Sequence, residues 1–236
     1  MNSIRMRANA IYLLLYASGI YGLVLWPPVR GFVTIIAEPL RRGVAPVLVH
    51  LPLSVRCVVA LIVFDALAYW VHRAAHAWPL LWRVHRVHHS DPDFGPMTTF
   101  RFHVLEIAWR MAAQLLPLYI LGIAASIPSS VWAVLLAFNV LAHSGLRWTF
   151  GPLRGAIVSP AFHAQHHRSE TAMHFGMFFA VWDVWFGTAQ RSKPASQTPS
   201  ITRSPAAFSI QESITRRCFT RSTERTTKCA VTVSPT

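Results

Sequence analysis

The sequence predicts an all-α fold, an integral membrane helical bundle of about four spans with a histidine-rich site for two metal ions. Hydrophobic residues make up 53% of the 236 residues and charged residues only 13%, against roughly a quarter charged in soluble domains. Apolar stretches alternate with short polar segments, and histidines collect where those stretches end. These features favour helices in a bilayer over a soluble core.

The first apolar stretch, residues 8–26, is expected to be an uncleaved membrane anchor. It has about the length that a helix needs to cross a bilayer. A signal peptide is the alternative, because the stretch follows a basic start and contains small residues. Pro27-Pro28 is expected to end this helix. Residues 29–54 would then be interfacial helix and loop, and residues 1–54 form an anchor and interfacial region.

The second membrane helix is predicted over residues 55–71 and continues as a polar stripe. The stripe consists of Asp65, Tyr69, His72 and His76. Their spacings of four, three and four place them on one helical face. A carboxylate in an apolar helix is costly unless it is paired. Asp65 is therefore expected to accept the ring N–H of a ligating histidine, or, alternatively, to cap the helix or pair with Arg73.

Two further histidine clusters follow the same helical spacing. The first consists of His85, His88 and His89, and the second of His163, His166 and His167. Spacings of three and four residues stack imidazoles on one face of a helix. Such faces suit a metal centre, and the repetition of the pattern argues against coincidence.

The third and fourth spans are expected at residues 104–127, broken by prolines, and residues 131–141. As a hairpin they would return the chain to the side it left, with His143 at the mouth beside the clusters. Glu106 and Arg110 at the start of the hairpin are four residues apart and predict an ion pair. His103 nearby is a possible additional ligand or proton relay.

The chain after the third cluster is expected to cover the site and then become disordered. His174 is a possible ligand, and residues 178–188 are apolar but too short to span. Asp183 is a second candidate acceptor for an imidazole N–H. Residues 191–236 are rich in Ser and Thr and basic, which predicts disorder. The net charge of +13 comes with no nucleic-acid-binding motif, so no nucleic acid partner is expected.

The candidate ligands are too many for one ion of four to six ligands, and therefore imply two metals. They are His72, His76, His85, His88, His89, His143, His163, His166 and His167. Imidazole suits zinc, iron, copper and nickel alike. A site at the mouth of an apolar bundle, open to lipid, favours a redox metal that activates O2 toward C–H bonds.

Three alternatives stay open. A zinc-dependent membrane hydrolase would usually carry an HExxH motif, which the sequence lacks. A metal transporter would place its ligands in the middle of the spans. A degenerate, non-catalytic membrane protein is the third.

The motifs HRAAH, HRVHHS, FRFH, AHS, HAQHH, HFG and WDVWFGT resemble the fatty acid hydroxylase/sterol desaturase superfamily over roughly residues 60–190. The resemblance implies that residues 55–190 are an integral-membrane, multi-pass, non-haem di-iron oxidoreductase with its histidine boxes facing the cytoplasm. It also implies that two iron ions and O2 act with external electrons to hydroxylate or desaturate a C–H bond of a membrane lipid. The nine histidines would be the iron ligands. The three histidine boxes are His72 and His76, then His85, His88 and His89, then His163, His166 and His167, and His143 is an added ligand.

The electrons are expected from a separate reductase, ferredoxin or cytochrome, because no haem-binding or nucleotide-binding motif is present. Basic side chains between the boxes could dock an acidic donor, although positive-inside topology explains them equally well. They are Arg73, Arg83, Arg86 and Arg168. The chain departs from the family pattern at His174 and Gly145, where Asn is usual, and in its tail.

Overall fold

The computed structural model describes residues 3–168 and 173–189, and the predicted all-α fold is confirmed in them. The α-helices of this part are α1 (Ser3–Ala17), α2 (Ile20–Leu48), α3 (Leu53–Ala77), α4 (Pro79–His89), α5 (Val104–Ile120), α6 (Ser129–Ala142), α7 (Pro160–Arg168) and α8 (Val181–Trp185). Short 3-10 turns connect them: η1 (Pro96–Phe100), η2 (Ala124–Ser126) and η3 (Gly151–Gly155). An isolated antiparallel bridge joins Ile157 to Phe179. The predicted disordered tail lies outside the described residues.

The N-terminal helices break at a different place from the one expected. The chain turns at Gly19, whose φ of 72° lies in the left-handed region that commonly ends helices. Pro27-Pro28 does not end a helix, and α2 continues through both prolines to Leu48. Much of the region expected to be loop is thus helical. Packing of α2 along α5 offsets the hydrogen bonds that the prolines remove.

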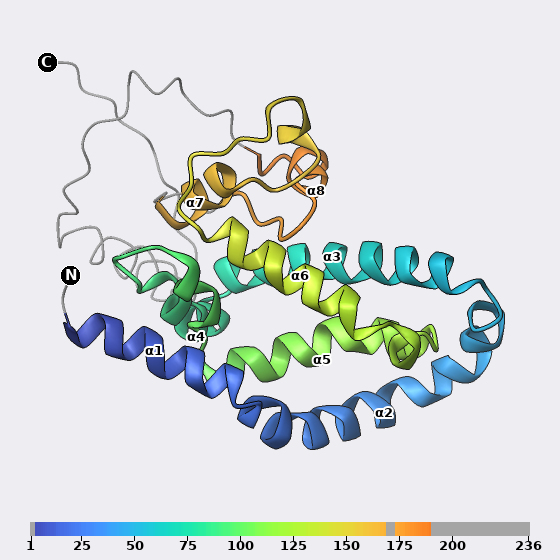
Figure 1. Ribbon diagram of the computed structural model, residues 1–236. Coiled ribbons are helices and arrows are strands. Elements are labelled where there is room, and N and C mark those ends of the chain that lie inside the picture. Colours follow the sequence, from blue (N-terminus) through green and yellow to red (C-terminus); the bar gives the residue numbers. More distant parts are fainter. Residues whose placement is uncertain (1–2, 169–172, 190–236) are drawn as a thin grey trace, which may run out of the picture. The chain divides into compact units, whose positions relative to one another are not determined.

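Helix α5 lies between α2 and α3 (Figure 1) and packs against both. A buried apolar cluster joins Ala60 of α3 to Leu118 of α5 and to Ile123 and Ile127 beyond it. Trp132 of α6 packs on this cluster. The cluster therefore holds α3 and the α5–α6 hairpin together.

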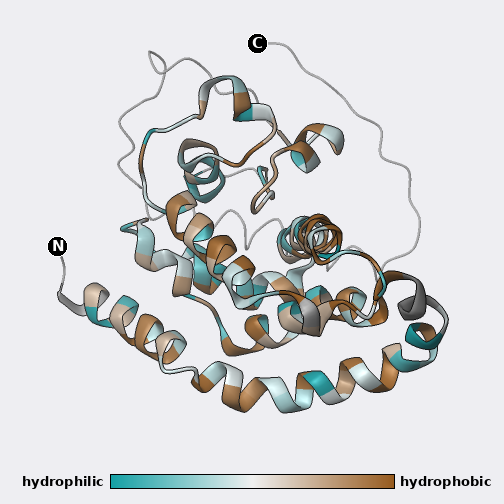
Figure 2. Ribbon diagram, turned by 45° about the vertical axis from the view of Figure 1, so that its right-hand side comes forward, coloured by the Kyte–Doolittle hydropathy of each residue, from teal (hydrophilic) through white to brown (hydrophobic). Residues whose placement is uncertain are grey.

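Two of the described helices are long and apolar enough to cross a membrane, namely Ile20–Gly43 within α2 and α3 itself. Their outer faces carry large apolar side chains, such as Ile35 of α2 at 79% and Val58 of α3 at 55% exposure. Brown hydrophobic residues line much of both helices in Figure 2. Helices α5 and α6 are shorter, at 17 and 14 residues.

The histidine-bearing ends of the helices meet on one side of the bundle. His72 and His76 lie in the last turns of α3, and His143 caps the C-terminal end of α6. The chain leaves α3 at Trp78, whose extended backbone separates α3 from α4, and Pro79 opens α4 at a position that suits proline. Ser90 then caps α4 directly after His89.

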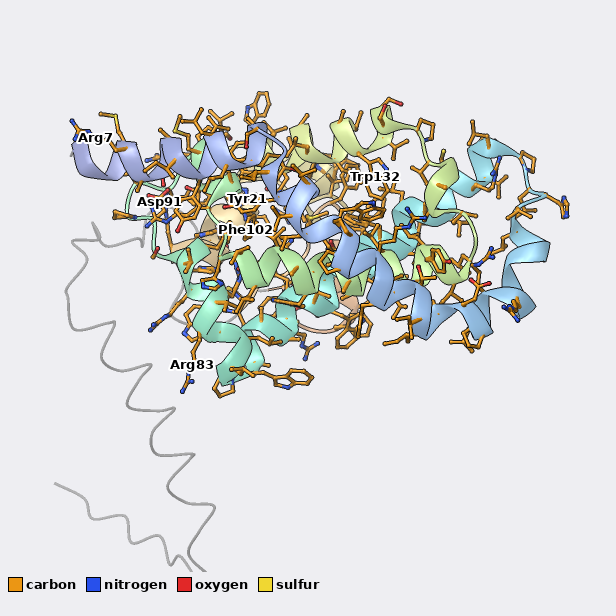
Figure 3. The ribbon with its side chains drawn as sticks, turned by 90° about the horizontal axis from the view of Figure 1, so that it is seen from below. Arg7, Tyr21, Arg83, Asp91, Phe102 and Trp132 are labelled. Carbon is orange, nitrogen blue, oxygen red and sulfur yellow. The ribbon has the colours of Figure 1, made fainter. Side chains whose placement is uncertain are left out.

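A buried polar network ties α1 to the loop that follows α4. The Asn9 side-chain amide donates to Asp91 at 2.9 Å, and Arg101 donates to the Asn9 side-chain oxygen Oδ1 at 2.8 Å. Thr98 donates to the same Asp91 oxygen at 2.7 Å. Figure 3 shows Asp91 beside α1. The network fixes the loop between the second histidine cluster and α5.

Candidate functional site

The structure brings together the nine histidines that the sequence singled out, in two groups. The first group contains His72, His76, His85, His89 and His166, and the second contains His88, His143, His163 and His167. Within each group the potential ligand atoms all lie within 4.8 Å of one another. Each group draws on residues far apart in the sequence, so the fold and not local spacing creates the sites.

The first group joins α3, α4 and α7. His85 Nε2 lies 3.1 Å from His76 Nε2, and His166 Nε2 lies 3.1 Å from His89 Nε2. The His72 and His166 rings meet edge to face with centroids 4.4 Å apart. Helix α4 contributes one turn to this group and thereby links the ends of α3 and α7.

The second group joins α4, α6 and α7. His143 Nε2 lies 3.2 Å from His88 Nε2 and 3.0 Å from His163 Nε2. The His88 and His167 rings have centroids 4.7 Å apart. His143, outside the three boxes in the sequence, is therefore at the centre of this group.

The two groups are in direct contact. His89 of the first group stacks on His167 of the second, with ring centroids 4.4 Å apart. Both α4 and α7 contribute residues to both groups. Ions held in the two groups would therefore be close neighbours.

Four imidazoles have their orientation set by an oxygen that can only accept a hydrogen bond. His72 Nδ1 donates to the Phe175 carbonyl oxygen at 2.9 Å, and His143 Nδ1 donates to the Asn139 carbonyl oxygen at 2.8 Å. In the same way the His166 Nδ1 bonds the Met173 carbonyl oxygen. The His85 Nδ1 bonds Glu106 Oε1 at 2.6 Å. In the neutral ring each of these histidines then presents an unprotonated Nε2 to its group.

This donor set fits metal ions. The unprotonated Nε2 of His143 faces the Nε2 atoms of His88 and His163. It has a single lone pair and can accept a hydrogen from only one of them. The Nε2 atoms of His72 and His167 are buried without a hydrogen-bond partner among the described residues. Converging lone pairs and unpaired buried nitrogens are unfavourable, and bound cations would satisfy them. Imidazole carrying an outer hydrogen bond is the usual form of a histidine ligand.

Burial keeps five of the imidazoles outside the spans in their neutral, metal-binding form. Loss of solvation lowers the pKa of His88, His89, His163 and His167 well below the ordinary value, and neighbouring imidazoles add to the effect. Burial also lowers the pKa of His166, to about 3. These five histidines are therefore deprotonated and available as ligands near neutral pH.

Asp65 does not make the contact expected of it. Its carboxylate accepts the backbone N–H groups of Phe178 at 2.8 Å and Phe179 at 3.0 Å, and the Trp182 ring N–H at 2.8 Å. Asp65 is fully buried and is satisfied by these donors. The helical stripe that contains it was predicted correctly, but its partner is the backbone before α8 and not an imidazole.

Asp183 likewise accepts from backbone and hydroxyl donors instead of an imidazole. Its Oδ1 receives hydrogen bonds from Phe175 N at 2.8 Å and Thr188 Oγ1 at 2.7 Å, and its Oδ2 receives one from Gly176 N at 2.7 Å. Burial raises the pKa of the Asp183 carboxyl, and these hydrogen bonds oppose the rise. Asp183 thus fixes the segment whose carbonyls contact His72 and His166.

The two possible extra ligands lie outside both groups. His103 caps α5, and its Nδ1 accepts the Leu105 N–H at 3.2 Å. His174 stacks on Phe162 with centroids 3.8 Å apart. The φ of His174 is 59°, a left-handed conformation that Asn and His adopt more readily than most residues.

The second departure from the family pattern has a similar backbone explanation. Gly145 follows α6 with a φ of 74°. Glycine adopts this conformation without strain, and asparagine is the commonest alternative. The substitution therefore preserves the turn that leads away from His143.

Sequence reasoning missed the role of Glu106. The expected pair with Arg110 is present at 3.4 Å, but the shorter contact of the same carboxylate oxygen is with His85. Glu106 is fully buried, whereas Arg110 is partly exposed. A pair with Arg110 alone would not need the carboxylate to be so deeply buried. A carboxylate at the start of an apolar helix was the available signal.

The segment that carries this site is similar to known proteins. The family model for fatty acid hydroxylase matches residues 57–188. An ornithine lipid hydroxylase of Rhizobium tropici is 31% identical over 152 residues, 62% of this chain and 45% of that protein. The alkylglycerol monooxygenase of Homo sapiens is 34% identical over 129 residues, 51% of this chain and 27% of that protein.

A very-long-chain aldehyde decarbonylase of Oryza sativa subsp. indica is 28% identical over 140 residues, 54% of this chain and 22% of that protein. The chain spans less than half the length of these relatives. No solved structure matches the chain significantly. The matched segment contains every histidine of the two groups and covers more than half of the chain. The protein belongs to the fatty acid hydroxylase family.

Proposed function

We propose that this protein is a membrane-bound, non-haem di-iron enzyme that uses O2 and external electrons to hydroxylate a C–H bond of a lipid. The first group of five histidines would hold one iron and the second group of four the other. In this proposal residues 55–190 form the catalytic domain and residues 1–54 anchor it, with about four spans in all. Hydroxylation is favoured over desaturation because two of the relatives are named a hydroxylase and a monooxygenase.

The observation that carries the proposal is the pair of adjacent imidazole groups with converging Nε2 atoms. One zinc ion would leave one of the groups without a cation. Paired metal ions also serve hydrolytic enzymes, so the pair alone does not select the reaction. The match to the fatty acid hydroxylase family and the relatives named a hydroxylase and a monooxygenase favour O2 chemistry over hydrolysis or transport.

The overall reaction balances with two electrons and two protons. One oxygen atom of O2 enters the C–H bond to give the alcohol, and the other leaves as water. When bound, the two irons would supply the activation of O2. The chain's own part is to hold the imidazoles in their neutral form and to exclude water from the site.

Aromatic side chains support that exclusion. Phe102 stacks on His88 with centroids 4.6 Å apart, and Phe94 packs at 4.7 Å from His167. Trp82 covers His76 at 5.0 Å. These rings surround the imidazoles with apolar surface, which limits contact with bulk water.

The proposed substrate is a lipid of the surrounding bilayer. Two candidate spans with exposed apolar faces lead to the histidine-bearing end. A chain entering from the bilayer would reach the site without crossing water. The relatives' names include an ornithine lipid and an alkylglycerol, so we propose a membrane lipid as the substrate class.

We propose that the electron donor is a separate reductase, ferredoxin or cytochrome that docks near α4 and α7 on the cytoplasmic side. Arg83, Arg86 and Arg168 are exposed there, and Arg83 points away from the helices in Figure 3. Arg73 is engaged with the Tyr69 hydroxyl at 3.1 Å and the Trp70 ring at 5.3 Å. The three exposed arginines are therefore the better docking candidates.

Metal analysis of the purified protein tests the proposal. We expect two irons per chain and O2-dependent appearance of a hydroxylated lipid when a reduced donor is supplied. His166→Ala and His88→Ala, one from each group, should each lower the iron content and abolish turnover. One zinc per chain, or no bound metal, would overturn the proposal. Comparing the lipids of cells with and without the protein identifies the substrate.

A further inference from the structure

We propose that Asp183 is a positioning residue for the five-histidine group alone, acting through the backbone of residues 173–176. This inference rests on the proposed function, because it assigns a role in binding one of the two proposed metals. Among the described residues, the Asp183 carboxylate accepts hydrogen bonds from Phe175 N, Gly176 N and Thr188 Oγ1, and none of these donors is one of the nine imidazoles. Its influence would pass through one short piece of main chain.

Residues 173–176 supply two of the oxygens that orient the five-histidine group. The carbonyl of Met173 accepts from His166 Nδ1, and the carbonyl of Phe175 accepts from His72 Nδ1. These two histidines come from α7 and α3, which are otherwise far apart in the sequence. The segment therefore sets the ring orientation of ligands from two different helices.

The carboxylate of Asp183 fixes that segment from the opposite side. Its two oxygens take the successive N–H groups of Phe175 and Gly176. A methyl group on Gly176 would lie 2.6 Å from the Phe179 carbonyl oxygen and 2.8 Å from Asp183 Oδ2. Only glycine allows the backbone to come this close to the carboxylate. The peptide at Gly176 therefore has little room to move.

The four-histidine group has no such dependence among the described contacts. His143 is oriented by the carbonyl of Asn139 in its own helix. The Nδ1 atoms of His88 and His163 have no hydrogen-bond partner among the described residues. A displacement of residues 173–176 would therefore disturb one group and leave the orientation of the other intact.

A chain of hydroxyl groups supports Asp183 further out. Thr188 Oγ1 donates its hydrogen to Asp183, so the Tyr69 hydroxyl, 3.0 Å away, donates to Thr188. Arg73 donates in turn to the Tyr69 oxygen at 3.1 Å. Every donor in this chain points toward the carboxylate, which favours its ionised form.

Asp183→Asn is the informative change. Whichever way the amide is turned, its NH2 group faces either the Phe175 N–H or the Gly176 N–H. Two donors then oppose each other, so the peptide must move and its carbonyls move with it. Loss of a histidine's outer partner typically weakens metal binding about 10–100-fold, and we expect a loss in this range.

The experiment measures metal affinity of the full chain by competition with a chelator, in two backgrounds. His167→Ala disables the four-histidine group, and His76→Ala disables the five-histidine group. We expect Asp183→Asn to weaken Fe2+ or Co2+ binding in the first background and to leave it unchanged in the second. Asp93→Asn, which alters an exposed carboxylate, is the matched control and should change neither.

A general structural role for Asp183 would weaken binding equally in both backgrounds and would overturn the inference, as would no change in either. If Asp183→Asn fails to fold, Thr188→Val removes one of the three hydrogen bonds on the carboxylate. It should give a smaller loss confined to the same background, and an equal loss in both backgrounds would again overturn the inference. Should the unsubstituted chain bind no metal, the proposed function itself fails, which is a different outcome.

Discussion

Replacing Glu106 by Gln tests how much the buried carboxylate contributes to the five-histidine group. Glu106 is fully buried, and its Oε1 accepts from His85 Nδ1 at 2.6 Å. Glutamine has nearly the same shape and can keep an oxygen toward His85. The change therefore removes the negative charge while it preserves the packing.

The magnitude follows from the two kinds of hydrogen bond. A hydrogen bond to a charged group contributes about 1.5–3 kcal/mol, and a neutral one about 0.5–1.5 kcal/mol. The difference, about 1–1.5 kcal/mol, corresponds to roughly a tenfold loss of metal affinity, because about 1.4 kcal/mol is tenfold at 25 °C. Glu106→Ala should cost more, because it leaves the His85 N–H without its acceptor.

Chelator competition on the purified protein measures this loss. Arg110→Gln is the control, because Arg110 donates to the same carboxylate oxygen at 3.4 Å but is not itself a hydrogen-bond partner of His85. Its effect should be smaller than that of Glu106→Gln. Equal affinity of Glu106→Gln and the unsubstituted chain, or an equal loss in Arg110→Gln, would refute the reasoning.

Three further predictions concern stability and pH. Gly176→Ala should lower the unfolding temperature measured in detergent and reduce metal content, because the added methyl group collides with the Asp183 carboxylate; unchanged values would show that the segment can shift freely. Asp91→Ala should lower the free energy of unfolding by about 1–3 kcal/mol, because it leaves the buried Asn9 amide without its acceptor, and denaturant titration would detect this. The metal-free protein should be most stable near pH 8 and lose stability progressively as the pH falls through about 6.5. The lowered pKa of His166 in the fold means that the unfolded chain takes up the proton first, so a stability that rises on acidification would contradict the burial argument.

Helical periodicity made much of the site predictable from the sequence. The spacings of the three clusters placed their imidazoles on helix faces, and the structure has helices at each of them: α3, α4 and α7. The hairpin argument also brought His143 to the correct end of the bundle. Local spacing could not show how the nine rings divide into two groups, because each group mixes residues from three helices.

The N-terminal helices were harder to predict for a tertiary reason. Adjacent prolines normally end a helix, yet α2 continues through Pro27-Pro28 because it packs along α5. The actual break, at Gly19, carries the left-handed φ that glycine permits. A local rule gave the wrong boundary where long-range packing decided the outcome.

Both buried aspartates were expected to bind imidazoles, and their actual partners follow from the backbone of residues 173–180. These residues are irregular chain beside the site, so their N–H groups lack helical partners and need acceptors. Asp65 accepts from Phe178 and Phe179, and Asp183 accepts from Phe175 and Gly176. With the N–H groups satisfied on one side, the carbonyls are left to receive imidazole hydrogens on the other. A buried carboxylate next to irregular backbone can therefore orient a histidine ligand that it never touches.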